Sequence, residues 1–128
     1  MVNDPIANLL NNLRNGYASR KIEIDIKKSR LLLNLLKVFK KYKYIENFKL
    51  NENKKSISIT LAYNEQDGAI HSVKQISKPS RRVYVNASKI PYPKNGRGII
   101  IITTPEGLMA HYEAKKKHIG GELICEVE

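Results

Sequence analysis

The chain has 128 residues, of which 41% are hydrophobic, which is enough for one compact unit or for two small lobes. Lys and Arg number 23 against 12 Asp and Glu, and the resulting charge of +11 indicates a polyanionic partner, either nucleic acid or an anionic membrane. The longest aliphatic run is four isoleucines at 99–102, far below the roughly 20 residues of a membrane-spanning helix. No apolar secretory signal is expected after Met1. A single cysteine, Cys125, excludes an intrachain disulfide.

The first residues predict an amphipathic helix. Asp4 followed by Pro5 is typical of a helix start, because Asp accepts hydrogen bonds from unpaired backbone N–H groups and Pro fits the first helical position. We expect Asn15 and Gly16 to end this helix or to bend it. Its apolar face has the spacing i, i+3, i+4 and i+7 and consists of Ile6, Leu9, Leu10 and Leu13.

A strand and a second helix are predicted next. Isoleucines at 22, 24 and 26 alternate with acidic residues, which is the pattern of a half-buried strand. Ser29 is expected to cap the second helix. The apolar stripe of that helix consists of Leu32, Leu35, Leu36 and Phe39.

Two strands complete the first half. They are expected at residues 44–50 and 57–63, joined by a polar turn at 51–55. This half therefore reads α-β-α-β-β, with helices available to cover one face of a small sheet. The polar run at 64–68 is the best candidate boundary, so we expect a first lobe at 1–64 and a second lobe at 69–128.

The second lobe is predicted to be mostly β. A short helix is expected to begin in the Thr-Pro-Glu-Gly sequence at 104–107 and to run to about Lys116. Gly120 and Gly121 then turn the chain into its last strand. The expected strands lie at 69–77, 83–85, 99–103 and 122–127. The fold class is therefore α+β, with an N-terminal α-β-α-β-β lobe and a C-terminal lobe that is mostly β with a short helix.

Metal binding and catalysis are not expected. The single cysteine and three histidines (His71, His111 and His118) show no zinc-ligand spacing. The glycines of Gly96-Arg97-Gly98 precede a strand, whereas a dinucleotide-binding loop follows one. Cys125 lies in an apolar alternation and is interpreted as a packing residue. We expect no catalytic residue, no cofactor and no small-molecule substrate.

Two hypotheses remain open for the basic residues beside Tyr84. Arg81 and Arg82 place guanidinium groups next to an aromatic ring, and guanidinium pairs with phosphate and stacks on bases. The alternative is a solvated edge strand that is protected by charge. The sequence favours neither.

Thr103 and Thr104 form the most informative polar pair. At a strand end before a helix start, two hydroxyls and free N–H groups can bind phosphate or a ribose 2′-OH. Helix capping explains Thr104 equally well but leaves Thr103 unexplained. Glu106 would repel phosphate, which limits this prediction.

The Gly120-Gly121-Glu122 sequence predicts a turn followed by a carboxylate. In a basic RNA-binding protein, such a Glu can accept from a base amino group or orient an Arg. Catalysis is not expected there, because Glu122 has no partner carboxylate and only His118 nearby.

Together these segments resemble small-subunit ribosomal protein 8 of the bacterial type, from residue 3 to residue 127. The start is carried by Asp4-Pro5-Ile6-Ala7 and Arg14-Asn15-Gly16, and the middle by Lys78-Pro79 and Arg82-Val83-Tyr84. The tail is carried by Gly96-Arg97-Gly98, Thr103-Thr104, Gly107, Ala114, Gly120-Gly121-Glu122 and Ile124-Cys125.

The resemblance implies two α/β lobes, a role early in small-subunit assembly and binding to the central domain of small-subunit ribosomal RNA. Pro105 and Glu106 depart from the family pattern by removing a hydroxyl and reversing a charge, which the lysines at 115–117 can offset. The RNA-binding residues that we expect are Asp4, Arg14, Asn15, Ser29, Arg30, Lys78, Arg81, Arg82, Tyr84, Thr103, Thr104, Lys115, Lys116, Gly120, Gly121 and Glu122.

The expected function is thus that of a structural ribosomal protein with ribosomal RNA and neighbouring ribosomal proteins as partners, and with no membrane partner. The alternatives are a generic basic nucleic-acid-binding protein and a small RNA-directed enzyme. Lys, Ile and Asn, which have AT-rich codons, are abundant. We therefore expect a ribosome in an organelle, with a mitochondrion favoured over a plastid, or in the cytoplasm of an AT-rich bacterium.

Overall fold

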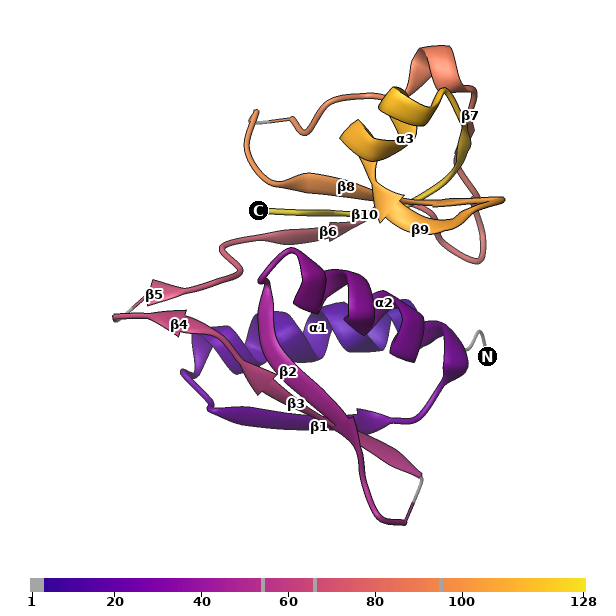
Figure 1. The fold of residues 1–128 in the computed structure, drawn as a ribbon. Coiled ribbons are helices and arrows are strands. Elements are labelled where there is room, and N and C mark those ends of the chain that lie inside the picture. Colours follow the sequence, from indigo (N-terminus) through magenta and orange to yellow (C-terminus); the bar gives the residue numbers. More distant parts are fainter. Residues whose placement is uncertain (1–3, 54, 66, 95) are drawn as a thin grey trace. The chain divides into compact units, whose positions relative to one another are not determined.

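The computed structural model describes residues 4–53, 55–65, 67–94 and 96–128 (Figure 1). Lys54 of the turn predicted at 51–55, Gln66 of the boundary predicted at 64–68, and Asn95 lie outside these residues. The chain packs as two compact units. The N-terminal unit is Pro5–His71, and the C-terminal unit is Ser72–Glu128 together with Asp4.

The N-terminal unit has the predicted α-β-α-β-β order. Its elements are α1 (Pro5–Ala18), β1 (Glu23–Lys27), α2 (Arg30–Lys41), β2 (Ile45–Leu50) and β3 (Ser56–Leu61). The antiparallel sheet has the order β1-β3-β2, and both helices lie on one face of it (Figure 1). All eight apolar residues predicted for the two helix stripes are buried. The 3.6-residue period therefore identified the helix faces correctly.

Gly16 does not end α1. The helix continues to Ala18, and Gly16 is buried within it. A Cβ atom at Gly16 would lie 3.0 Å from Ile24 Cγ2, so the glycine allows α1 to approach β1 closely. The prediction of a helix stop was wrong because close packing and a C-terminal cap both use glycine.

Two details at the strand ends also differ from expectation. Ile22 lies just before β1 and is 77% exposed, so the buried alternation begins at Ile24. Beyond β3, β4 (Tyr63–Asn64) and β5 (Asp67–Gly68) form a small antiparallel hairpin.

The C-terminal unit is mostly β with one short α-helix, which confirms the predicted α+β class. Its strands are β6 (Val73–Gln75), β7 (Tyr84–Val85), β8 (Ile99–Thr104), β9 (Gly107–Ala110) and β10 (Gly121–Val127), and its helices are the 3₁₀ turn η1 (Ala87–Lys89) and α3 (His111–Lys117). The sheet has the order β6-β10-β8-β9, and β7 also pairs with β10. The core beneath α3 contains Ile90, Ile100, Ile102, Met109, Ala114 and Leu123.

Two predictions for this unit were wrong. The strand expected at 69–77 is confined to Val73–Gln75, the residues in regular antiparallel register with β10. Ile76 and Ser77 still donate backbone hydrogen bonds to β10 but lie outside that register. The helix expected to begin at 104–107 begins at His111 instead. Residues 104–107 form a tight turn into β9, where Gly107 has a φ of +109°.

Candidate nucleic-acid interface

Three strands of the C-terminal unit bring three predicted site residues into one row. In β10, Glu122 pairs with Tyr84 of β7 on one side and with Thr103 of β8 on the other. Directly paired residues of an antiparallel sheet project from the same face. An exposed aromatic ring, a carboxylate and a hydroxyl are therefore neighbours across the sheet, and Tyr84 is 69% exposed.

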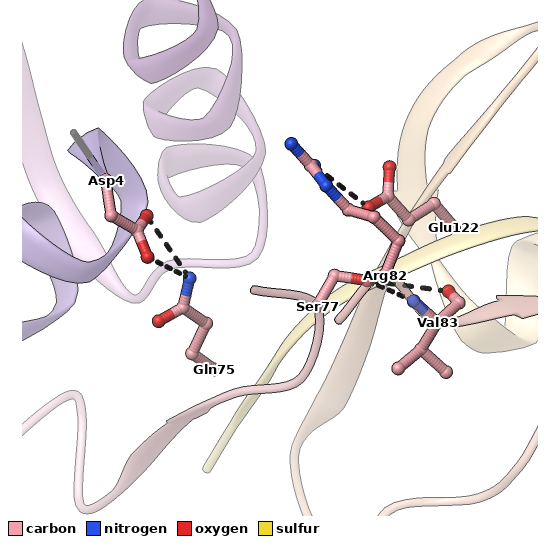
Figure 2. Close-up of polar contacts among 6 residues, drawn as sticks. All are labelled: Asp4, Gln75, Ser77, Arg82, Val83 and Glu122. Carbon is pink, nitrogen blue, oxygen red and sulfur yellow. Dashed lines mark hydrogen bonds and ion pairs between the residues drawn. The ribbon is translucent and has the colours of Figure 1, made fainter. Parts of the chain in front are cut away.

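Arg82 joins this row through an ion pair. Its Nη1 donates to Glu122 Oε2 over 3.1 Å, as Figure 2 shows. The Glu122 side chain is 12% exposed and that of Arg82 is 54% exposed. The carboxylate thus anchors the guanidinium group while most of its donors still face solvent. We call Arg82, Tyr84, Thr103 and Glu122 the polar row.

The two threonines have different environments. Thr104 Oγ1 donates to the Gly107 carbonyl over 2.8 Å and accepts from the Glu106 N–H over 3.1 Å, so its hydroxyl closes the β8–β9 turn. Within the described residues, the Thr103 hydroxyl has no hydrogen-bond partner. The prediction of a phosphate site at a helix N-terminus was wrong here, because α3 begins only at His111. The Thr103 hydroxyl remains available in the polar row.

Gly120 and Gly121 allow neighbouring strands to approach β10 closely. A Cβ atom on Gly121 would lie 2.0 Å from the Thr103 carbonyl oxygen, and one on Gly120 would lie 2.3 Å from the Val85 carbonyl oxygen. Any side chain would push β7 or β8 away. The absence of side chains at these two positions thus allows the strands that carry Tyr84 and Thr103 to pack closely on either side of β10.

Arg81 is separated from its sequence neighbour Arg82. It pairs with Lys78 in an antiparallel bridge, in which each backbone N–H donates to the carbonyl of the other residue over 2.9 Å. The two arginines therefore have different environments, because Arg82 is held by Glu122 whereas Arg81 belongs to a small turn.

The lysines of α3 have defined neighbours. Lys115 Nζ lies 3.3 Å from the centroid of the Tyr92 ring, an exposed aromatic residue that sequence reasoning missed. Lys117 Nζ lies 3.7 Å from Glu106 Oε1, and Lys116 is exposed. Lys117 thus lies beside Glu106 on the surface, and both side chains are about half exposed.

The predicted residues at the start of the chain are divided between the units. Asp4 belongs to the C-terminal unit, where its carboxylate accepts from Gln75 Nε2 over 3.0 Å (Figure 2). Arg14 lies on α1, and its Nη1 donates to Asn11 Oδ1 over 2.7 Å. Asn15 is exposed on the same helix.

Ser29 and Arg30 lie at the N-terminus of α2. Ser29 is the N-cap residue, but its side chain makes no capping hydrogen bond, and Arg30 is exposed. The first turn of α2 contains no acidic residue. The hydroxyl, the guanidinium group and the positive end of the helix dipole are thus compatible with an anion.

The remaining titratable residues have structural environments. Burial raises the pKa of the Cys125 thiol to about 12, so Cys125 is a packing residue. His111 is buried and its Nδ1 accepts from the Ile100 N–H over 3.1 Å. In the described part of the chain, no three His, Cys, Asp or Glu side chains cluster as metal ligands would. None of the helices described is long and apolar enough to cross a membrane.

Comparison with known proteins agrees with the resemblance noted in the sequence. Residues 4–127 match the family model described as Ribosomal protein S8. The small ribosomal subunit protein uS8 of Bartonella henselae is 41% identical over 129 residues, and that of Syntrophobacter fumaroxidans is 42% identical, with 98% of both chains covered in each case. The uS8 protein of Chlamydia trachomatis serovar L2b is 39% identical, with 98% of this chain and 96% of the relative covered. These relatives are bacterial and give no support to the expected mitochondrial source. The chain therefore belongs to the ribosomal protein S8 family.

Proposed function

We propose that this protein is a structural constituent of the small ribosomal subunit that binds small-subunit ribosomal RNA, with the lobe at 69–128 as its main RNA-binding part. Family membership over residues 4–127 supports this proposal. The observation that carries it is the polar row, in which Tyr84, Glu122 and Thr103 lie side by side on three paired strands. The specific target that we propose is the central domain of that RNA.

The chemistry of the polar row suits RNA. The Tyr84 ring can stack on an unpaired base, and the Thr103 hydroxyl can donate to or accept from a ribose 2′-OH. Glu122 is a positioning residue for Arg82, whose remaining donors can reach phosphate. Because the major groove of A-form RNA is too narrow for side chains, we expect contacts to the minor groove and to irregular, unpaired positions.

The high positive charge supplies affinity. If lysines and arginines of both units neutralise about 5–8 phosphates, the logarithm of affinity falls with the logarithm of salt concentration with a slope of roughly −4 to −7. We propose that Ser29 and Arg30 contribute one such phosphate contact at the N-terminus of α2. Because phosphate contacts carry no sequence information, specificity then depends on the C-terminal unit.

A competition titration tests this function. The purified protein is titrated with a stem from the central domain of bacterial small-subunit ribosomal RNA at two salt concentrations, with excess transfer RNA as competitor. Binding that survives the competitor supports the proposal. Loss of binding to competitor and moderate salt would indicate a generic polyanion-binding protein, and cleavage of the labelled stem would indicate an RNA-directed enzyme.

We further propose that the protein resides in the ribosome of an AT-rich bacterium and contacts neighbouring small-subunit proteins. The bacterial relatives support a bacterial ribosome. Sedimentation of the tagged protein with 30S particles from a bacterial lysate, followed by crosslinking, would test both points.

A further inference from the structure

An open hollow of about 350 Å³ lies at the β6 edge of the C-terminal sheet, separate from the polar row. Three cationic side chains line it, those of Lys74, Lys78 and Arg81. The rest of its lining consists of Gln75, Ile76, Val83 and Glu126. None of the four polar-row residues belongs to this lining, and sequence reasoning did not single out Lys74.

Two of the cations come from one tight turn. Lys78 and Arg81 are directly bridged, with two reciprocal backbone hydrogen bonds of 2.9 Å across Pro79 and Ser80. Bridged antiparallel residues project from the same side of the chain. An ammonium and a guanidinium group are thereby held next to each other by the backbone.

A second contact closes the base of this turn. Ser77 is buried, and its Oγ accepts from the Val83 N–H over 2.9 Å and lies 3.5 Å from the Val83 carbonyl oxygen, to which it donates (Figure 2). The segment 77–83 is therefore a closed loop pinned to the sheet. Preorganised cations lose less conformational freedom when they bind an anion.

The charges of the hollow are not neutralised within the described structure. Lys74, Lys78 and Arg81 make no ion pair and no side-chain hydrogen bond among the described residues. Glu126 is the one acid in the lining, and its Oε2 accepts from the backbone N–H of Lys94 over 3.2 Å. Three cations thus face a single carboxylate that already has a partner.

We propose that this hollow is a phosphate-binding site that takes backbone phosphate of the bound RNA, as a second contact beside the polar row. The inference rests on the proposed RNA-binding function. Guanidinium pairs with phosphate oxygens in a two-pronged geometry, and the two ammonium groups add point charge. Because the hollow would contact phosphate and no base edge, it would contribute affinity and help to position the RNA, without any sequence preference.

A matched pair of double variants tests the site. Lys78→Ala with Arg81→Ala removes one Lys and one Arg from the hollow, and Lys89→Ala with Arg97→Ala removes the same charge from exposed positions outside it. For the hollow variant we expect an affinity for the ribosomal stem about tenfold lower at low salt and a salt slope less negative by about 1 to 2. The control should change both quantities much less.

Equal losses in the two double variants would overturn the site, because charge alone would then explain the effect. All replaced side chains are exposed, so the fold should persist; if melting shows damage, Lys74→Ala provides a second variant.

The source of the phosphate is tested by NMR, in which tripolyphosphate should shift the amides of residues 74–83 and RNA should displace it. Shifts that RNA does not displace would indicate a free-phosphate site and refute the RNA contact. If the wild-type protein binds ribosomal stem and transfer RNA equally, the proposed function fails while the hollow is still tested by the same variants.

Discussion

Gly121→Ala is the substitution that most severely tests the close approach of β8 and β10. The added Cβ atom would lie 2.0 Å from the Thr103 carbonyl oxygen, whereas real Cβ contacts are essentially never under 3.0 Å. The Cβ position is fixed by the backbone of β10 and the carbonyl oxygen belongs to the backbone of β8, so neither atom can rotate away and relief requires the strands to separate by about 1 Å. Overpacking of this kind costs about 2–4 kcal/mol.

Thermal unfolding followed by circular dichroism measures this effect. For a protein of this size, that loss corresponds to a fall in Tm of roughly 10 °C. Gly96→Ala is the matched control, because Gly96 has a φ of +68° and a Cβ there meets nothing within 4 Å, so it carries backbone strain without a clash. We expect it to cost about 1 kcal/mol. A Gly121→Ala protein that melts within 2 °C of wild type would refute the argument from close approach.

Four further predictions concern single residues. Thr103→Val should weaken RNA binding about five- to tenfold without changing Tm, because the hydroxyl has no partner among the described residues; equal affinity in a titration would remove it from the interface. His118→Gly should raise Tm by a few degrees in a calorimetric scan, because His118 has a φ of +58° at the end of α3, and a lower Tm would contradict this. Burial, and to a smaller extent Lys115, lowers the pKa of His111 below 6.5, although Glu126 acts to raise it. As pH falls below about 6.5, the unfolded chain therefore takes up the proton first and the folded state loses stability. Urea titrations of wild type and His111→Gln should diverge at low pH, and parallel curves would refute this. The Cys125 thiol should not react with a disulfide reagent at pH 8 until urea unfolds the protein, and rapid native labelling would disprove its burial.

Sequence periodicity predicted the elements whose burial is local and regular. The stripe of α2 and the alternation of β3 report directly which face of each element is buried. The turn at 104–107 shows the limit of such signals, because Thr-Pro-Glu-Gly is compatible both with a helix start and with a tight turn. The pairing of Thr103 with Leu108 decides between them, and no local pattern reports that pairing.

The candidate interface was predicted as a list of residues, whereas its arrangement depends on contacts between distant parts of the chain. Glu122 lies 40 residues after Arg82, yet the two form an ion pair. The hydrogen bonds between Ser77 and Val83 depend on a buried hydroxyl. A single Ser before a basic loop does not predict such a contact from the sequence. Sequence reasoning therefore supplied the chemistry of the site but not its division into a polar row and a separate cationic hollow.

The most direct test of the central claim is to map the RNA on the protein by NMR. Amide shifts of the ¹⁵N-labelled protein are followed as the central-domain stem is added with excess transfer RNA present. We predict that the largest shifts occur at residues 82–84, 103–104 and 120–122, with a second group at 74–81 and a smaller one near Ser29. Shifts that vanish with the competitor, or that avoid the polar row while RNA stays bound, would contradict specific RNA recognition by this face of the C-terminal unit.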